Sequence, residues 1–111
     1  MLKRRNEPFK DFWVLPGGVI NYEETAQQAA RREVKEEAGL SIDLGEVVSI
    51  YRIDTDPRGI HIDIIFSAAS HGEISLSKED SQWQYFSVQE LPENIAYKHR
   101  EAIQDWAKPK S

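Results

Sequence analysis

The chain has 111 residues, 40% of them hydrophobic and 30% charged, with a formal net charge of −5. This length suits one domain, which we place over residues 1–111. No apolar run reaches the roughly 20 residues of a membrane span, and we expect no secretory leader, so the predicted location is the cytoplasm with no membrane partner. The negative charge argues against a nucleic-acid partner. Because cysteine is absent, a bound metal must be held by oxygen or by the three histidines.

Two elements are predicted in the first third of the chain. A short strand over residues 12–15 lies in DFWVLPGG and ends at a proline and two glycines. The stretch ETAQQAARREVKEEAG then predicts a helix over residues 25–38, in which Thr25 and Gln28 fit a capping box and Gly39 fits the position after the end. A narrow stripe of small apolar side chains suits close packing on a sheet. It consists of Ala26, Ala30, Val34 and Ala38.

The next part of the chain predicts three strands. The segments EVVSIYRI (46–53) and QWQYFSV (82–88) are rich in residues that favour strands. Directly after residues 46–53, DTDPRG has the composition of a loop that leads into the next strand. The segment GIHIDIIFSA (59–68) alternates in a way that predicts a strand with one apolar face. That face contains Ile60, Ile62, Ile64, Phe66 and Ala68.

A second helix is predicted near the end of the chain, within AYKHREAIQDWA. Four residues recur there at helical spacing, so we expect them to pack on the sheet. They are Ala96, His99, Ile103 and Trp106.

Three carboxylates crowd one side of the first predicted helix. Glu33, Glu36 and Glu37 stand within RREVKEEAGL at spacings of three and four residues. Side chains at these spacings lie about 5–6 Å apart, where like charges repel. One interpretation is a solvated charged face balanced by the neighbouring basic residues. The other is a functional cluster in which something offsets the repulsion.

The residues around this cluster resemble a known motif. From Gly18 to Leu40 the chain reads G-x5-E-x7-R-E-V-x-E-E-x-G-L, which resembles the Nudix box of the MutT-like hydrolases at every fixed position. The segments WVLPGG, DPRG and LPENIAYKHREAI are similar to the ADP-ribose pyrophosphatase branch of that family. These outer motifs are less specific than the box over residues 18–40.

The resemblance implies a fold and an activity. The implied fold is an α/β Nudix-like α/β/α sandwich with a mixed β-sheet. The implied activity is hydrolysis of a nucleoside diphosphate linked to another moiety, first of all ADP-ribose to AMP and ribose 5-phosphate. Mg²⁺ is the expected cofactor, with Mn²⁺ as a second choice, because hard cations prefer oxygen ligands and neutralise phosphate charge. The alternatives are a nucleoside triphosphate pyrophosphohydrolase and a non-catalytic nucleotide sensor.

The metal ligands follow from the same resemblance. Glu33, Glu36 and Glu37 resemble the family's metal-binding carboxylates, and the carbonyl of Gly17 resembles its backbone ligand. Arg32 is similar to the residue that orients the glutamates by ion pairing. A bound cation would offset the repulsion within the cluster. The complete set of box glutamates argues against the sensor, which has no need of a metal that activates water.

The general base and the substrate contact are less well defined by the motif. Glu37 and Glu79 are both candidates for the base, and Asp80 is a weaker substitute for Glu79. Arg58 lies in the DPRG loop, where it can reach a phosphate or ribose, although an exposed loop arginine is the alternative. Tyr22, Tyr51 and Trp83 are candidates for adenine stacking or, alternatively, for packing.

Two departures from the family pattern affect these expectations. Where related sequences often carry a further acid after the double glycine, this chain reads NYEE. Relatives also carry a strand before a segment like LKRR, so we expect the N-terminal strand to be missing, an exposed sheet edge and a homodimer that covers it. We interpret His61 and His99 as packing or surface residues and His71 as part of a turn.

Overall fold

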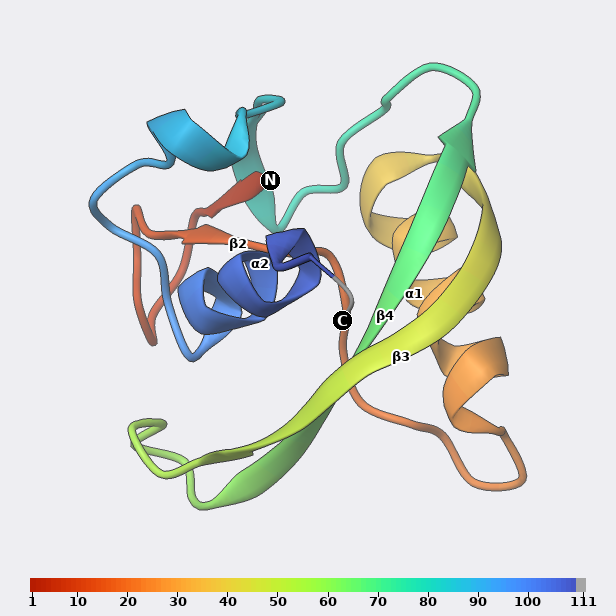
Figure 1. Ribbon diagram of the computed structural model, residues 1–111, viewed down its shortest axis with the longest axis horizontal. Coiled ribbons are helices and arrows are strands. Elements are labelled where there is room, and N and C mark those ends of the chain that lie inside the picture. The colour runs from red at the N-terminus through yellow and green to blue at the C-terminus, as the bar shows by residue number, and fades with distance from the viewer. Residues whose placement is uncertain (110–111) are drawn as a thin grey trace.

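The computed structural model describes residues 1–109 as five strands, two α-helices and one 3-10 turn (Figure 1). This mixed α/β architecture confirms the predicted fold class. In chain order the elements are β1 (Leu2–Arg4), β2 (Trp13–Val14), α1 (Ala26–Ala38), β3 (Ser41–Ile53), β4 (His61–His71), β5 (Asp80–Trp83), η1 (Val88–Glu90) and α2 (His99–Ala107).

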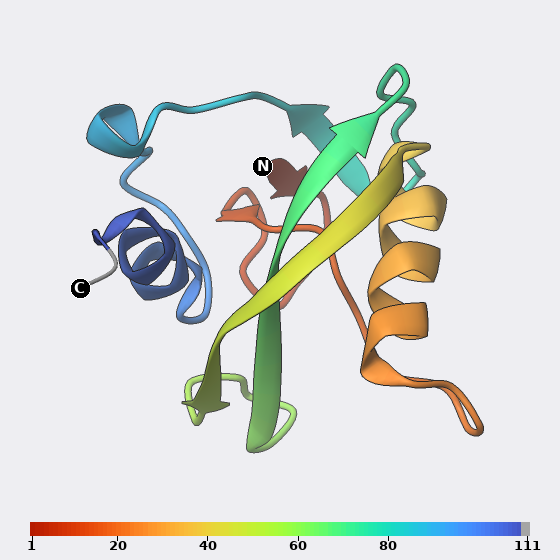
Figure 2. The same ribbon diagram turned by 45° about the vertical axis from the view of Figure 1, so that its right-hand side comes forward.

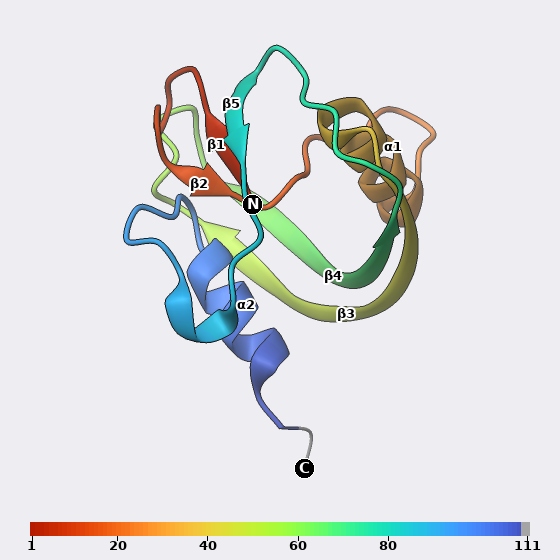
Figure 3. The ribbon, with the colours of Figure 1, turned by 90° about the horizontal axis from the view of Figure 1, so that it is seen from above.

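The strands form two antiparallel sheets. One has the order β2-β1-β5, with Leu2 opposite both Val14 and Trp83. The other is the long β3–β4 hairpin, which lies below the small sheet in the view of Figure 3. Within the described residues, the parallel part of the expected mixed sheet is a single bridge between Trp13 and Ile95. Helix α1 lies at one end of the hairpin and α2 on the other side of the molecule (Figure 2).

Helix α1 begins and ends where its local sequence predicts. The Thr25 hydroxyl accepts from the Gln28 backbone N–H, and the Gln28 side chain accepts from the Thr25 N–H, which completes the capping box. At the other end Gly39 takes a left-handed conformation with φ of 71°, and its N–H donates to the Lys35 carbonyl at 3.0 Å. Both ends are therefore fixed by groups within the helix or next to it.

The predicted strands all have somewhat different bounds in the structure, and the largest differences are in β3 and β5. Strand β3 starts at Ser41, five residues before the predicted start, because its partner β4 continues to His71 and pairs with it there. His71 is therefore a strand residue and not part of a turn, and its Nε2 lies 2.6 Å from Asp43 Oδ2. Strand β5 ends at Trp83 and not at residue 88, because its partner β1 is only three residues long.

The core has two parts. Leu2, Val14 and Ala96 form the first, between the small sheet and the segment before α2. The second joins α1 to the start of β3 and consists of Val34, Ala38 and Leu40, with Ile42 and Ile74 packed against them. Val34 and Ala38 of the predicted helix stripe are buried. The third buried residue of α1 is Ala29, which is not part of that stripe.

Two predicted apolar surfaces are more exposed than the sequence indicates. Ile62 is 67% exposed and Ile64 is 38% exposed, on the face that they share with Ile50 opposite Ile64. On α2, Trp106 is 58% exposed, while Ala102 is fully buried. The packing on the sheet expected of Trp106 is therefore wrong, and the apolar face of β4 lies largely open at Ile62. Among the described residues, no helix is long and apolar enough to cross a membrane.

Candidate functional site

The glycine loop, which we define as residues 15–18, meets the acidic end of α1. The Gly17 N–H donates to Glu37 Oε2 at 2.8 Å. The carboxyl group of Glu33 lies against Gly18, where an added Cβ would stand 2.5 Å from Glu33 Cδ. Gly18 therefore has no room for a side chain while Glu33 keeps this position. Two of the glutamates from the box thus touch the loop whose carbonyl is expected to bind metal.

Arg32 binds three carboxylates of the box. Its Nε and Nη2 donate to the two oxygens of Glu24 at 2.7 and 2.9 Å, and its Nη1 donates to Glu33 at 2.8 Å and to Glu36 at 3.1 Å. A further bond reaches the Val19 carbonyl at 2.9 Å. Hydrogen bonds from Arg32 lower the pKa of Glu24, and those bonds in turn raise the pKa of Arg32. The expected orienting contacts of Arg32 are present in this geometry.

Glu37 is partly buried and stands among other acidic side chains. Burial first, and then the charges of Asp80, Glu33 and Glu79, raise the pKa of Glu37 to about 8, while the hydrogen bond from the Gly17 N–H opposes the shift. Asp80 is itself only 6% exposed, and burial followed by the charge of Glu79 raises its pKa. The structure therefore brings both candidate acids of the 79–80 segment into the electrostatic surroundings of Glu37.

The backbone explains this proximity. The Ser77 N–H donates to the Glu37 carbonyl at 3.0 Å, and the Ser75 N–H donates to the Ala38 carbonyl at 2.8 Å. These bonds satisfy carbonyls at the end of α1 that have no partner within the helix. They also bring the segment that leads to Glu79 alongside the helix end. Nothing in the local sequence indicates this contact, because it joins segments about forty residues apart.

The donor set at this site fits a hard cation. Its side-chain donors are carboxylate oxygens, and a bound divalent cation would offset the burial and the neighbouring negative charges that raise the pKa of Glu37. Within residues 1–109, however, no group of three or more acidic or histidine side chains lies close enough together to hold a metal ion. Glu36 is the outlier, because its side chain is 59% exposed and bound to Arg32. The ligand roles of the three glutamates stay a prediction.

Arg58 lies in a different environment from the glutamates. It forms a two-pronged pair with Asp56, at 3.0 Å from Nε to Oδ1 and 2.8 Å from Nη2 to Oδ2, and also donates to the Tyr97 hydroxyl at 3.1 Å. Hydrogen bonds from Arg58 lower the pKa of the buried Asp56 to about 2. Sequence reasoning missed Asp56, although an acid two residues before a loop arginine is a usable signal.

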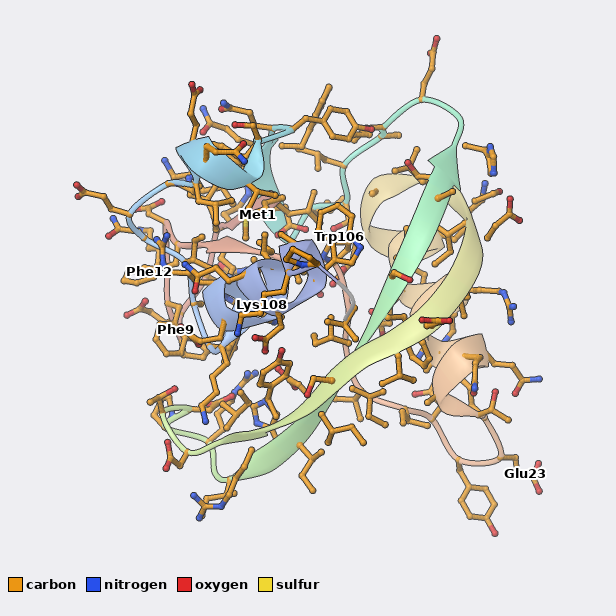
Figure 4. All side chains as sticks on the ribbon, in the orientation of Figure 1. Met1, Phe9, Phe12, Glu23, Trp106 and Lys108 are labelled. Atoms are coloured by element: carbon orange, nitrogen blue, oxygen red, sulfur yellow. The ribbon has the colours of Figure 1, made fainter. Side chains whose placement is uncertain are left out.

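An open groove of ≈ 660 Å³ borders Arg58. On its other side Phe9 packs edge-to-face on Phe12 with ring centroids 5.5 Å apart (Figure 4). The residues that line the groove are Glu7, Pro8, Phe9, Thr55, Pro57 and Arg58. None of the box glutamates is among them, so the structure does not bring Arg58 into the acidic site.

The three candidate stacking residues are also separate from one another. Tyr22 is 95% exposed in the loop before α1, whose outer tip carries Glu23 (Figure 4). The Tyr51 hydroxyl donates to Asp105 at 2.5 Å, and Trp83 packs edge-to-face on Tyr85.

A chain of histidines and aspartates joins the Arg58 loop to the glycine loop, and sequence reasoning missed it. His99 is only 8% exposed, and its Nδ1 accepts the Leu15 N–H at 2.9 Å. Asp63 lies between the two histidines, 3.7 Å from His99 Nε2 and 3.2 Å from His61 Nε2. His61 Nδ1 in turn lies 3.8 Å from Asp56. The packing expected for His99 is correct, but its bond to the loop was not foreseen.

Comparison with known proteins links the whole chain to one family. The family model described as "NUDIX domain" matches residues 1–106. An ADP-ribose pyrophosphatase of Methanocaldococcus jannaschii is 34% identical over 113 aligned residues, which cover 100% of this chain and 66% of that protein. The "ADPR responsive transcriptional repressor NtrR" of Acinetobacter baylyi is 31% identical over 94% of this chain and 44% of its own length. The chain thus spans less than two thirds of each of these relatives.

Solved structures share the fold. A MutT NUDIX hydrolase from Burkholderia pseudomallei superposes with a TM-score of 0.86 at 24% identity, over 94% of this chain and 84% of that chain. The NUDIX domain of NrtR from Shewanella oneidensis, solved as a complex with ADP ribose, gives 0.74 at 21% identity over 95% and 72%. At these identities the likeness establishes the fold alone.

Proposed function

The chain belongs to the NUDIX family, and from this premise we propose that it hydrolyses a nucleoside diphosphate linked to another moiety, with ADP-ribose as the preferred substrate. The products would be AMP and ribose 5-phosphate. The observation that carries the proposal is the raised pKa of the partly buried Glu37, which accepts the Gly17 N–H and lies beside carboxylates held by Arg32. The full-length similarity to an ADP-ribose pyrophosphatase supports the choice of substrate.

Mg²⁺, with Mn²⁺ as a substitute, would be held by Glu33, Glu36, Glu37 and the Gly17 carbonyl. When bound, such an ion neutralises phosphate charge and lowers the pKa of a water. The rest of the chemistry falls to the chain. Glu37, which has a raised pKa, is the first choice to take a proton from the attacking water, and Glu79 is the second. Arg32 keeps Glu33 and Glu36 oriented.

Arg58 and the groove beside it are the proposed contact for the remote part of the substrate. The guanidinium is fixed by Asp56, yet its side chain is 63% exposed, so it presents a pre-oriented positive charge at the groove. Such a charge suits a phosphate or a ribose hydroxyl. A contact far from the reacting bond would affect binding more than turnover.

Two other functions have specific support. The similarity to a repressor described as ADPR-responsive favours a nucleotide sensor without catalysis. The similarity over 76% of the chain to a MutT-like protein of Streptomyces ambofaciens favours cleavage of nucleoside triphosphates. A sensor would bind ADP-ribose without cleaving it. A triphosphate hydrolase would release pyrophosphate.

A substrate panel separates these possibilities. Products from ADP-ribose and from the four deoxynucleoside triphosphates would be separated by chromatography, with Mg²⁺ and with excess chelator. We expect kcat/KM for ADP-ribose to be at least roughly tenfold higher, about 1.4 kcal/mol in transition-state binding, and no turnover in chelator. Equal or faster cleavage of the triphosphates would overturn the substrate assignment. Binding of ADP-ribose without any product would favour the sensor.

The setting of this activity is part of the same proposal. We place the enzyme in the cytoplasm with its small nucleotide substrate, and we expect it to act as a homodimer. The exposed face formed by Ile50, Ile62 and Ile64 on the β3–β4 hairpin supports association, because an apolar patch of this kind gains free energy when a second copy covers it.

A further inference from the structure

Strand β2 is held along one edge by the segment that leads into α2 (Figure 1). The Trp13 N–H donates to the Asn94 carbonyl at 2.8 Å, and the Ala96 N–H donates to the Trp13 carbonyl at 3.0 Å. In a regular parallel ladder, the next hydrogen bond would run from the Leu15 N–H to the Ala96 carbonyl. That carbonyl instead receives the His99 N–H at 3.4 Å, and the His99 ring accepts the Leu15 N–H. The imidazole thus replaces a backbone acceptor where the ladder breaks off.

The backbone of the 94–99 segment explains the break. Tyr97 has a positive φ of 59°, which turns the chain away from β2 and into the first turn of α2. His99 then opens the helix with its ring directed back at Leu15. Its Nδ1 carries no proton in this arrangement, because it accepts a hydrogen bond, so the proton of the neutral ring is on Nε2. Asp63 faces that Nε2 at 3.7 Å and favours this tautomer.

The bond to Leu15 fixes one end of the glycine loop. Two residues later, the Gly17 N–H donates to Glu37, so the other end is fixed at the acidic site. Between the two anchors stands Pro16, whose ring restricts the backbone. A displacement of Leu15 is therefore transmitted to Gly17 through a short and stiff connection.

We infer that His99 is a positioning residue for the glycine loop. From outside the box motif, its bond to Leu15 keeps the Gly17 N–H aligned with the Glu37 carboxylate. The inference rests on the proposed function only in that the Gly17 carbonyl is taken as a metal ligand. His99 does not touch substrate or metal. It acts by accepting the Leu15 N–H, and Asp63 supports it by selecting the tautomer that can do so.

Two substitutions at this position separate the acceptor from the side-chain volume. His99→Asn places an amide oxygen near the position of Nδ1 and keeps an acceptor for Leu15. His99→Leu keeps comparable bulk and removes the acceptor. His71→Leu is the matched control, because His71 is an exposed histidine at the far end of β4. Each variant would be compared with the unaltered chain for Mn²⁺ binding by electron paramagnetic resonance, for kcat and KM, and for hydrogen exchange of the Leu15 and Gly17 amides.

We expect His99→Leu to weaken Mn²⁺ binding and to lower kcat, each by roughly tenfold or more, as loss of a group that supports a metal ligand does. KM should change much less, and both amides should exchange faster. His99→Asn should stay within about threefold of the unaltered chain in every measurement, and so should His71→Leu. If His99→Leu does not fold, His99→Gln replaces it, because its amide reaches the position of Nε2 and offers no acceptor near Nδ1.

The inference is overturned if a folded variant without the acceptor binds Mn²⁺ as the unaltered chain does, or if His99→Asn loses as much as His99→Leu. An unaltered chain that binds Mn²⁺ but cleaves no nucleotide would defeat the proposed function, while the binding comparison would still decide the role of His99. An unaltered chain without Mn²⁺ binding would defeat both.

Discussion

Two arginine-centred networks, one at Arg32 and one at Arg58, show opposite balances of charge. Arg32 is shared by three carboxylates, and Glu37 stands beside them with no salt bridge to a cation among residues 1–109. Arg58 forms its ion pair with one carboxylate, that of Asp56. The pKa of Glu37 rises to about 8, through burial first and through the neighbouring acids as well, whereas the pKa of Asp56 falls to about 2 through its bonds to Arg58.

The difference indicates what each network is for. A carboxylate fully matched by one guanidinium is already satisfied, and it shapes the loop that carries it. The charged form of a buried carboxylate without a cationic partner is unfavourable until a cation binds. Groups with pKa values perturbed in this way concentrate at functional sites. The region of Glu37 is therefore the better candidate for catalysis and the region of Arg58 for binding.

The largest effect is expected from Glu37→Gln. The substitution keeps the shape of the side chain and removes its charge, so turnover of ADP-ribose should fall by roughly 10² to 10⁴, as loss of a metal ligand or base does. Initial rates in saturating Mg²⁺ measure the effect. Arg58→Gln is the matched variant and should raise KM several-fold with kcat nearly unchanged. Near-normal turnover by Glu37→Gln would remove the distinction between the two networks.

The second effect concerns stability without metal. Because the pKa of Glu37 rises from an ordinary value of 4.5 to about 8, the unfolded chain loses that proton first, and stability falls as pH rises from about 4.5 to 8. The fall should amount to a few kcal/mol and should be absent from Glu37→Gln. Asp56 has the opposite sign, because its lowered pKa contributes stability above about pH 3.8 that is lost as pH falls toward 2.

Urea unfolding in excess chelator at about pH 5 and about pH 8 measures this dependence. The unaltered chain should be less stable at the higher pH, and added Mg²⁺ should restore the loss because it binds the ionised carboxylate. Equal stability of the unaltered chain and Glu37→Gln at both values would show that Glu37 is not held in an unfavourable charged state.

The third effect is smaller and lies in the Arg58 network. Asp56→Asn removes the charge that holds Arg58 but leaves an exposed guanidinium that water can solvate, so it should cost only about 1–2 kcal/mol of stability. It should also raise KM for ADP-ribose, since Arg58 is no longer pre-oriented at the groove. Thermal melts and steady-state rates together test this. A fall in kcat without a change in KM would place this network in the chemical step.

How far the sequence predicts these features depends on where the determining contacts lie. The ends of α1 follow from Thr25, Gln28 and Gly39, which act on neighbouring residues, and the prediction is confirmed there. The end of β5 depends on the length of β1, which pairs with it from about eighty residues away, and the predicted bound is wrong.

The same rule holds for the site. The box glutamates and Arg32 stand in one short stretch, so their pattern is visible in the sequence. The bond between Leu15 and His99 joins residues 84 positions apart, and no local pattern encodes it. The burial of Asp56 and Asp80 likewise depends on segments brought together only by the fold.

The smallest effect on the folded chain, and the last prediction, concerns the exposed face of the β3–β4 hairpin. Ile62 is 67% exposed, so Ile62→Lys should change the stability of a single copy by no more than about 0.5 kcal/mol. If a second copy covers this face, the new charge would be buried at the interface without a partner, and the dimer should dissociate. Light scattering at micromolar concentrations should show twice the monomer mass for the unaltered chain and the monomer mass for Ile62→Lys. A monomer in both cases would mean that this face stays open to solvent. The site around Glu37 would then act within a single copy of the chain.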